Sequence, residues 1–188
     1  MPYEAIVIGT SSGGLNALQL LLPALPADFP APVIIVQHIS PHSDSYWIRY
    51  LNAACALNVK EAEEKEAIAR GNIYIAPPNY HLLVEKDKTF SLTVGEKVNY
   101  ARPSIDVLFE TAAEAWREKL AGIILTGSNS DGKTGIRRIK ECGGFTIAQD
   151  PATAESPYMP AAAIEGGNID AIYSLEEIVN ILLQKVYF

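Results

Sequence analysis

Short apolar runs and amphipathic segments alternate along most of the chain, and small or polar residues close each apolar run. The runs are rich in β-branched residues, which is typical of buried strands, and the segments between them carry apolar residues at helical spacing. Strands are predicted at residues 5–8, 33–36, 72–76, 122–126 and 145–149, with shorter candidates at 59–62 and 169–173. Helices are predicted at residues 15–22, 46–54 and 135–141, with one opened by Pro103-Ser104 and one by a capping box from Ser174 to Glu177.

Strands that alternate with helices over short loops predict a mostly parallel sheet with helices on both faces. The expected fold is therefore a three-layer α/β/α, doubly wound architecture. The pattern changes once, where apolar runs at residues 82–85 and 90–94 flank Lys86-Asp87-Lys88 and predict a small antiparallel hairpin insert. In doubly wound sheets ligands bind beyond the carboxyl ends of the strands, so the residues that follow the parallel strands are the candidates for chemistry.

Composition and charge limit the class of protein. The chain has 188 residues, of which 48% are hydrophobic and 20% charged, so residues 1–188 are predicted to form a single globular domain. The net charge of −7 argues against a nucleic-acid surface and fits a soluble cytoplasmic protein. Cys55 and Cys142 form no metal-binding or redox spacing, and no cofactor is predicted. The first predicted strand begins close to Met1, which leaves no room for a signal peptide, and no apolar run is long enough to span a membrane.

The turn after the first predicted strand carries the first candidate residue. The segment Gly9-Thr10-Ser11-Ser12-Gly13 fits the G-x-S-x-G pattern, in which a serine nucleophile stands on a tight turn between a strand and a helix. The dinucleotide fingerprint G-x-G-x-x-G fails here because position 11 is serine. An ordinary strand–helix connection remains the alternative, because serine and glycine are common in such turns.

Two more strand ends carry residues that suit the same chemistry. His38 follows the second predicted strand, and Asp131 follows the strand predicted at residues 122–126. Parallel strands end at one edge of the sheet, so Ser11, His38 and Asp131 are expected to meet there. They would serve as nucleophile, proton carrier and orienting carboxylate. The other histidines, His42 and His81, have no clear partner, and Pro41 argues against shared metal binding by His38 and His42.

The loop around Asp131 admits a second interpretation. From Gly127 to Thr134 it matches the phosphate-binding pattern G-x-x-x-x-G-K-[ST], between a predicted strand and helix. However, Asp131 would put a carboxylate into a cradle meant for phosphate, and no later strand offers a clear magnesium-binding aspartate. A P-loop-type nucleotide-binding protein is therefore the alternative function. A simple turn that caps the following helix remains possible too.

Several ordered segments of the chain resemble one known family, the catalytic domain of the chemotaxis protein-glutamate methylesterases, or CheB. The resemblance covers nearly the whole chain, and a set of ordered blocks is more specific than any single motif. The blocks lie at residues 8–14, 37–38, 73–77, 102–109 and 125–132, and at 148–149 with 159–160.

The resemblance implies a serine hydrolase that demethylates glutamate methyl esters on chemoreceptors and deamidates certain receptor glutamines. It implies that Ser11 is the nucleophile, His38 the general base and then acid, and Asp131 the orienting carboxylate. The backbone N–H groups of Ser12 and Ser128 would form the oxyanion hole. The implied partners are the methylated cytoplasmic helices of chemoreceptors or related sensory proteins.

The chain departs from the family pattern in three ways. After His38, it has Ile39-Ser40-Pro41 where Met-Pro is usual. The family's aspartate loop usually reads Gly-Met-Gly-x-Asp-Gly, but here Ser128 and Asn129 replace the methionine and the second glycine. Family members usually also carry an N-terminal receiver domain, which is missing from residues 1–188. We therefore expect either constitutive activity or control by a receiver domain in trans. A catalytically inactive relative that only binds receptors is a further alternative.

Overall fold

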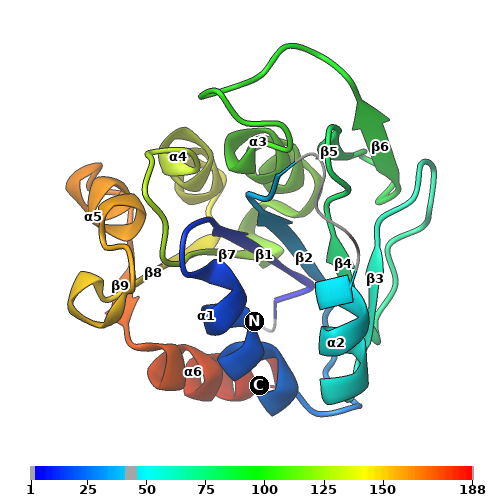
Figure 1. Ribbon diagram of the computed structural model, residues 1–188, viewed down its shortest axis with the longest axis horizontal. Helices are drawn as coiled ribbons and strands as arrows, with labels where there is room; N and C mark the ends of the chain where they lie inside the picture. Colours follow the sequence, from blue (N-terminus) through cyan, green and yellow to red (C-terminus); the bar gives the residue numbers. More distant parts are fainter. Residues whose placement is uncertain (1–2, 41–45, 188) are drawn as a thin grey trace.

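A central sheet of seven parallel strands forms the frame of the structure, a computed structural model that describes residues 3–40 and 46–187 (Figure 1). The strands lie in the order β3-β4-β2-β1-β7-β8-β9, and every neighbouring pair in this sheet is parallel. Their bounds are β1 Ala5–Thr10, β2 Val33–Gln37, β3 Asn58–Glu61, β4 Asn72–Ile75, β7 Leu120–Ile124, β8 Phe145–Gln149 and β9 Ala171–Tyr173. The predicted parallel sheet is confirmed.

Helices cover both faces of this sheet, as the alternating pattern predicts (Figure 1). One layer contains α1, α2 and α6, and the other contains α3, α4 and α5. Side chains of β1 alternate between them, since Ile6 and Ile8 pack toward the first layer and Ala5 and Val7 toward the second. The helices are α1 Gly14–Leu21, α2 Tyr46–Ala54, α3 Ile105–Trp116, α4 Lys133–Glu141, α5 Tyr158–Glu165 and α6 Leu175–Tyr187, with short 3₁₀ turns at Leu22–Ala24, Arg117–Lys119 and Pro151–Thr153.

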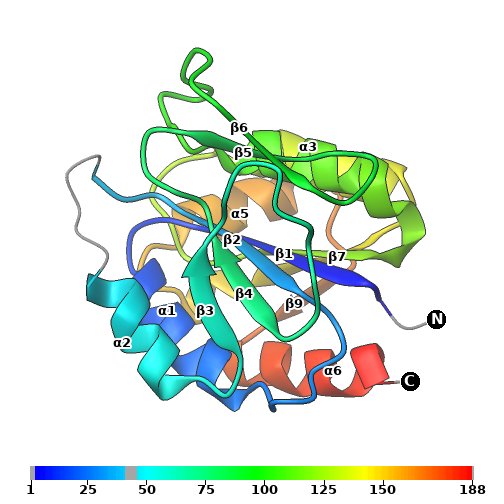
Figure 2. The same ribbon diagram turned by 90° about the vertical axis from the view of Figure 1, so that its right-hand side faces the viewer.

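The predicted hairpin insert is present as β5 (His81–Val84) and β6 (Phe90–Thr93), which pair antiparallel and lie beside α3 (Figure 2). Phe90 packs edge-on against Tyr74 of β4, with the ring centroids 4.9 Å apart. This contact joins the insert to the main sheet. The segment between β6 and α3 then passes over the carboxyl ends of the strands and lines the cavity described below.

Two expectations from the sequence need correction. Helix α5 was not predicted, because Pro160 and a run of alanines hide its amphipathic pattern; a proline within the first helical turn loses no intrahelical hydrogen bond. Strand β7 was predicted at residues 122–126 but occupies Leu120–Ile124.

The capping box is confirmed, since Ser174 N–H donates to Glu177 Oε2 at 2.8 Å and Glu177 N–H donates to Ser174 Oγ at 3.3 Å.

The order of the strands reverses at β1. On one side of β1 lie β2, β4 and β3, of which the chain forms β3 at the edge before β4, and the chain then returns to the other side of β1 with β7, β8 and β9. The carboxyl ends of β2, β1 and β7 are therefore neighbours at the switch point, where doubly wound folds bind their ligands. Gly9 lets α3 approach this point, because a Cβ at that position would overlap with Ile105 Cγ2. In the described part of the chain, no helix is long and apolar enough to cross a membrane.

Candidate active site

The three predicted site residues follow three neighbouring strands. Ser11 comes after β1, His38 comes after β2, and Asp131 lies in the loop between β7 and α4. Ser11 and His38 line a cavity of about 450 Å³ at this edge of the sheet. Asp131 is 1% exposed and lies beneath the cavity, hydrogen-bonded to His38. The structure therefore brings together the residues that the strand ends predict, while their catalytic roles stay a prediction.

Gln37, the last residue of β2, ties the serine turn to the histidine. Its Nε2 donates to the carbonyl oxygens of Ser11 and of His38, both at 2.9 Å. Gln37 is 3% exposed, so these hydrogen bonds are shielded from water. The Ser11 N–H in turn donates to Thr126 O at 3.0 Å, which fixes the same turn to the segment after β7.

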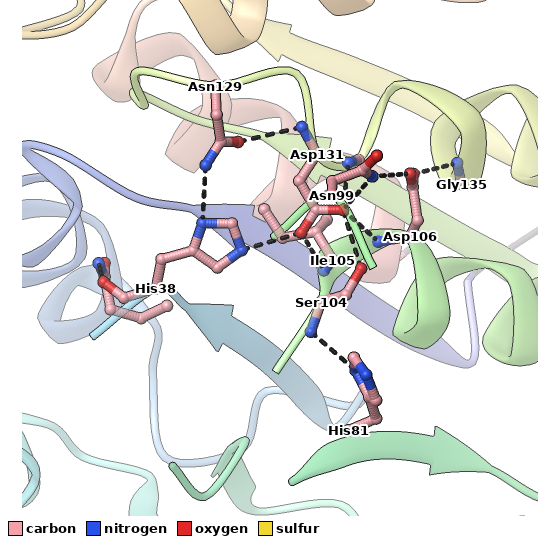
Figure 3. Close-up of polar contacts among 11 residues, drawn as sticks. His38, His81, Asn99, Ser104, Ile105, Asp106, Asn129, Asp131 and Gly135 are labelled. Carbon is pink, nitrogen blue, oxygen red and sulfur yellow. Dashed lines mark hydrogen bonds and ion pairs between the residues drawn. The ribbon is translucent and has the colours of Figure 1, made fainter. Parts of the chain in front are cut away.

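The carboxylate of Asp131 sits at the N-terminus of α3. Its Oδ2 accepts from His38 Nε2 at 2.8 Å and from the Ile105 N–H at 2.7 Å (Figure 3). Its Oδ1 accepts from Ser104 Oγ at 2.9 Å and from the Asp106 N–H at 3.2 Å. A helix N-terminus offers free N–H groups and a partial positive charge, so it is a favourable place for a buried anion.

These hydrogen bonds decide the charge of Asp131. Burial opposes its ionisation, but hydrogen bonds from His38, Asn99 and the Ile105 N–H outweigh burial, so the pKa of Asp131 lies below its ordinary value. The group is therefore an anion at neutral pH. It can hold a proton on His38 Nε2 and stabilise the ring when the ring becomes positively charged.

A second buried carboxyl, Asp106, lies next to Asp131 and behaves differently. Asn99 Nδ2 donates to both, to Asp106 Oδ2 at 2.8 Å and to Asp131 Oδ1 at 3.0 Å (Figure 3). Asp106 Oδ1 accepts from the Gly135 N–H at 2.6 Å. Burial raises the pKa of Asp106 to about 6 despite these hydrogen bonds, and the charge of Asp131 adds to the rise. The neighbouring pair thus contains one firmly ionised carboxylate and one that titrates near neutral pH.

The other ring nitrogen of His38 is bound by Asn129. Asn129 Nδ2 lies 3.2 Å from His38 Nδ1 (Figure 3). Among the hydrogen bonds of the described residues, none joins Ser11 Oγ to the ring. Asn129 Oδ1 accepts from the Asp131 N–H at 3.0 Å. The expected serine–histidine contact is therefore absent from this state of the site, and an asparagine takes its place.

The residues expected to form an oxyanion hole, Ser12 and Ser128, lie side by side. Their hydroxyl oxygens are 2.9 Å apart, although the residues are 116 positions apart in the sequence. Thr126 holds the two turns together, since its Oγ1 donates to Ser12 O at 2.8 Å and the Thr10 hydroxyl donates to Thr126 O at 2.9 Å. The turns that carry Ser12 and Ser128 are thus adjacent, while the oxyanion role of their N–H groups stays a prediction.

The geometry of the loop that begins at Gly127 disfavours the phosphate-binding interpretation. Two N–H groups that such a cradle would offer to phosphate are already used, because Asp131 N–H donates to Asn129 Oδ1 and Gly132 N–H donates to Asp131 Oδ1 at 3.1 Å. The loop encloses its own carboxylate, which would repel a phosphate. Gly132 makes this path possible with a φ of 95°.

Of the other two histidines, His81 lies in the described part of the chain and does not contact His38 or Asp131 directly. His81 is 2% exposed; its Nδ1 accepts from the Ser104 N–H at 3.2 Å, and its Nε2 lies 2.8 Å from Glu96 O. It therefore supports the residue whose hydroxyl binds Asp131. His42 lies outside the described residues, and within them no group of three or more histidine, cysteine, aspartate or glutamate side chains is placed to hold a metal ion.

Several residues that shape the site were not predicted from the sequence, namely Asn99, Ser104, Asp106 and Asn129. Ser104 and Asp106 stand in a block that resembles the family, but nothing in that block shows where their side chains bind. For Asn129, the signal was the replacement of the glycine that the family pattern has at this position. The asparagine at this position contacts His38 Nδ1 and the Asp131 N–H.

Comparisons with known proteins find one family over nearly the whole chain. The family model described as CheB methylesterase matches residues 6–182. A protein of Leptospira interrogans with the name "Putative protein-glutamate methylesterase/protein-glutamine glutaminase" is 56% identical over 98% of this chain and 95% of its own length. The protein-glutamate methylesterase/protein-glutamine glutaminase of Archaeoglobus fulgidus is 39% identical over 96% of this chain and 54% of its own length. This chain thus spans about half the length of that relative.

A solved structure is similar over the whole chain. The crystal structure of the Thermotoga maritima CheB methylesterase catalytic domain superposes with a TM-score of 0.93 at 36% sequence identity. The match covers 98% of this chain and 99% of the other. A likeness of this extent includes the sheet, both helical layers and the edge of the sheet where the cavity lies.

Proposed function

The chain belongs to the CheB methylesterase family, and from this premise we propose that it hydrolyses glutamate methyl esters on chemoreceptors with Ser11 as nucleophile. Deamidation of receptor glutamines is the second activity, as in the names of its relatives. The observation that supports this assignment most directly is the His38–Asp131 pair, 2.8 Å apart, beside Ser11 in one cavity.

In the proposed reaction, Ser11 Oγ attacks the ester carbonyl while His38 Nδ1 takes the serine proton. Asp131 stabilises the resulting imidazolium through Nε2, which lies 2.8 Å from its Oδ2. The main-chain N–H groups of Ser12 and Ser128 would bind the oxyanion. The imidazolium then protonates the departing methoxide, methanol leaves, and water activated by His38 releases the glutamate from Ser11.

We further propose that residues 1–188 form one catalytic unit that acts in the cytoplasm on the methylated helices of receptors or related sensory proteins. A receiver domain supplied in trans is the candidate regulator. Methanol release measured with and without a phosphorylated receiver domain tests this part. A change in rate would support control in trans, and an unchanged rate would support constitutive activity.

The test of the main proposal compares two neighbouring serines. Ser11→Ala is expected to lower methanol release from methylated receptor by roughly 10³-fold or more, because the nucleophile is lost. Ser12→Ala is the matched control and is expected to retain at least about a tenth of the activity, because it keeps the main-chain N–H that is proposed to act. Circular dichroism checks that both variants fold.

A small chromogenic ester separates this proposal from an inactive relative that only binds receptors. Wild-type turnover that disappears in Ser11→Ala supports the esterase. A wild-type protein without turnover on either substrate, or a Ser11→Ala variant with full activity, refutes it.

A further inference from the structure

Asn129 holds a fixed orientation between the catalytic loop and His38. Its Oδ1 accepts from the Asp131 N–H at 3.0 Å, and its Nδ2 lies 3.2 Å from His38 Nδ1 (Figure 3). A main-chain N–H can only donate, so it requires the amide oxygen on its side. The amide NH₂ must then face the ring. The orientation of Asn129 is therefore determined by the loop itself.

This orientation also determines the tautomer of His38. An amide NH₂ can only donate, so Nδ1 must carry the lone pair in this contact. The ring proton is then on Nε2, where it is donated to Asp131 Oδ2 at 2.8 Å. Asn129 and Asp131 thus select the same neutral tautomer from opposite sides of the ring. It is the tautomer whose Nδ1 can accept a proton from a serine.

The same contact uses the lone pair that Ser11 needs. We propose that Asn129 is a positioning residue that competes with Ser11 for His38 Nδ1, and so restrains the first step of the reaction; this inference rests on the proposed function. Ser11 and Asn129 both line the cavity around His38. Because an aromatic nitrogen offers one lone pair in the ring plane, Ser11 Oγ gains its full hydrogen bond only when the amide moves aside.

Proton transfer makes the contact unfavourable. When Nδ1 takes the serine proton it becomes an N–H donor, and it then faces the NH₂ of Asn129, which is also a donor. The amide cannot simply turn over, because its oxygen is held by the Asp131 N–H. Asn129 therefore stabilises the resting site but not the transition state, and such an interaction slows the chemical step.

Asn129 makes two contacts, one with His38 Nδ1 and one with the Asp131 N–H, and substitutions can remove the first while keeping the second. In Asn129→Ser the short hydroxyl can still accept from the N–H two residues further on, as in an ST-turn, but it cannot reach His38. We expect Ser11 to react roughly two- to tenfold faster in this variant, the amount that corresponds to one neutral hydrogen bond. KM for a small ester should change little, because the interaction that the substitution removes joins Asn129 to His38 and does not involve the substrate.

Asn129→Asp should have the opposite effect. The carboxylate keeps the size of asparagine and still accepts from the Asp131 N–H, but it presents an acceptor to Nδ1. A ring between two carboxylates holds a proton on both nitrogens and cannot serve as a base. Ser11 should therefore react more slowly in this variant. Mere loosening of the loop would slow both variants, so opposite signs distinguish the two explanations.

The reaction is followed as the rate at which a fluorophosphonate labels Ser11 and as steady-state hydrolysis of p-nitrophenyl acetate. ¹⁵N NMR of the histidine rings provides a readout without substrate: Asn129→Ser should move the His38 Nδ1 resonance and leave Nε2 in its protonated range. Asn180→Ser, on an exposed position of α6 in the opposite helical layer, is the control.

Faster labelling in Asn129→Ser, slower labelling in Asn129→Asp and a shifted Nδ1 resonance would support the proposal. Equal or slower labelling in a folded Asn129→Ser variant would overturn it while leaving the esterase assignment intact, provided that the wild type is labelled at Ser11. A wild type that is not labelled at Ser11 would overturn the proposed function, and this inference with it.

Discussion

Replacing Asp106 with asparagine should change how the stability of the protein depends on pH. Asp106 is 5% exposed, and burial raises its pKa to about 6 from the ordinary value of 3.8. The charge of Asp131 adds to the rise, and hydrogen bonds from Gly135 N–H and Asn99 oppose it. Over the range between these two values the folded protein keeps a proton that the unfolded chain has lost. The stabilisation is complete below the unfolded pKa and is lost as the pH rises through about 6.

The size of the effect follows from the two pKa values. The full difference corresponds to roughly 3 kcal/mol at about 1.36 kcal/mol for each pKa unit. As the pH falls from 8 to 5, proton binding by folded Asp106 raises the free energy of unfolding by roughly 1.4 kcal/mol. Asparagine does not titrate, so the variant lacks this term. Its oxygen can still accept from Gly135, while its NH₂ would face the NH₂ of Asn99, at a cost that does not depend on pH.

Urea unfolding of wild type and Asp106→Asn at several pH values between 5 and 8 measures the effect. The difference in free energy of unfolding should shift by roughly 1.4 kcal/mol across this range, with the wild type gaining toward pH 5. Asp87→Asn, at an exposed aspartate of the hairpin turn, is the control. A difference between wild type and Asp106→Asn that is the same at pH 5 and pH 8 would show that burial does not hold a proton on Asp106, and the reasoning would fail.

Two further substitutions test the framework around the site. Gln37→Leu removes the donors to the carbonyl oxygens of Ser11 and His38. It should lower ester hydrolysis by roughly tenfold or more, because an unpaired buried acceptor costs about 1–3 kcal/mol. Unchanged hydrolysis would show that Gln37 does not position Ser11 and His38. Gly132→Ala should lower the melting temperature more than Gly143→Ala. Both glycines have positive φ, but a Cβ at position 132 would overlap Ile124 Cδ1 at 2.5 Å, whereas a Cβ at position 143 would make an ordinary contact with Glu118 Cβ at 3.4 Å. Equal losses would indicate that backbone strain alone determines the effect.

Much of the fold follows from the hydrophobic pattern. The runs that form β1, β2 and β7 are buried on both faces, and such runs leave a strong signal that does not depend on distant partners. Because parallel strands end at one edge, the meeting of Ser11, His38 and Asp131 could be predicted without coordinates. Helix α5 could not, since Pro160 normally argues against a helix and is tolerated only by its place in the first turn.

The finer arrangement of the site depends on contacts between segments far apart in the sequence. Asn99 and Asp131 are 32 positions apart, and His38 and Asn129 are 91 apart. Nothing in the local sequence around Asn99 shows that its amide bridges two buried carboxyls. The tautomer of His38 depends likewise on which way one amide points. Such details follow from packing, so periodicity and motif spacing do not contain them.

The placement of Asp131 at the start of α3 links activity to local folding. Its carboxylate keeps its charge inside the protein because the Ile105 and Asp106 N–H groups are held in helical geometry. If the first turn of α3 opens, the anion loses these donors while the sheet below is still intact. The enzyme would then be inactivated by a local opening whose free energy is smaller than that of global unfolding. Protection of the Ile105 and Asp106 amides from hydrogen exchange therefore reports the fraction of molecules that are competent to react.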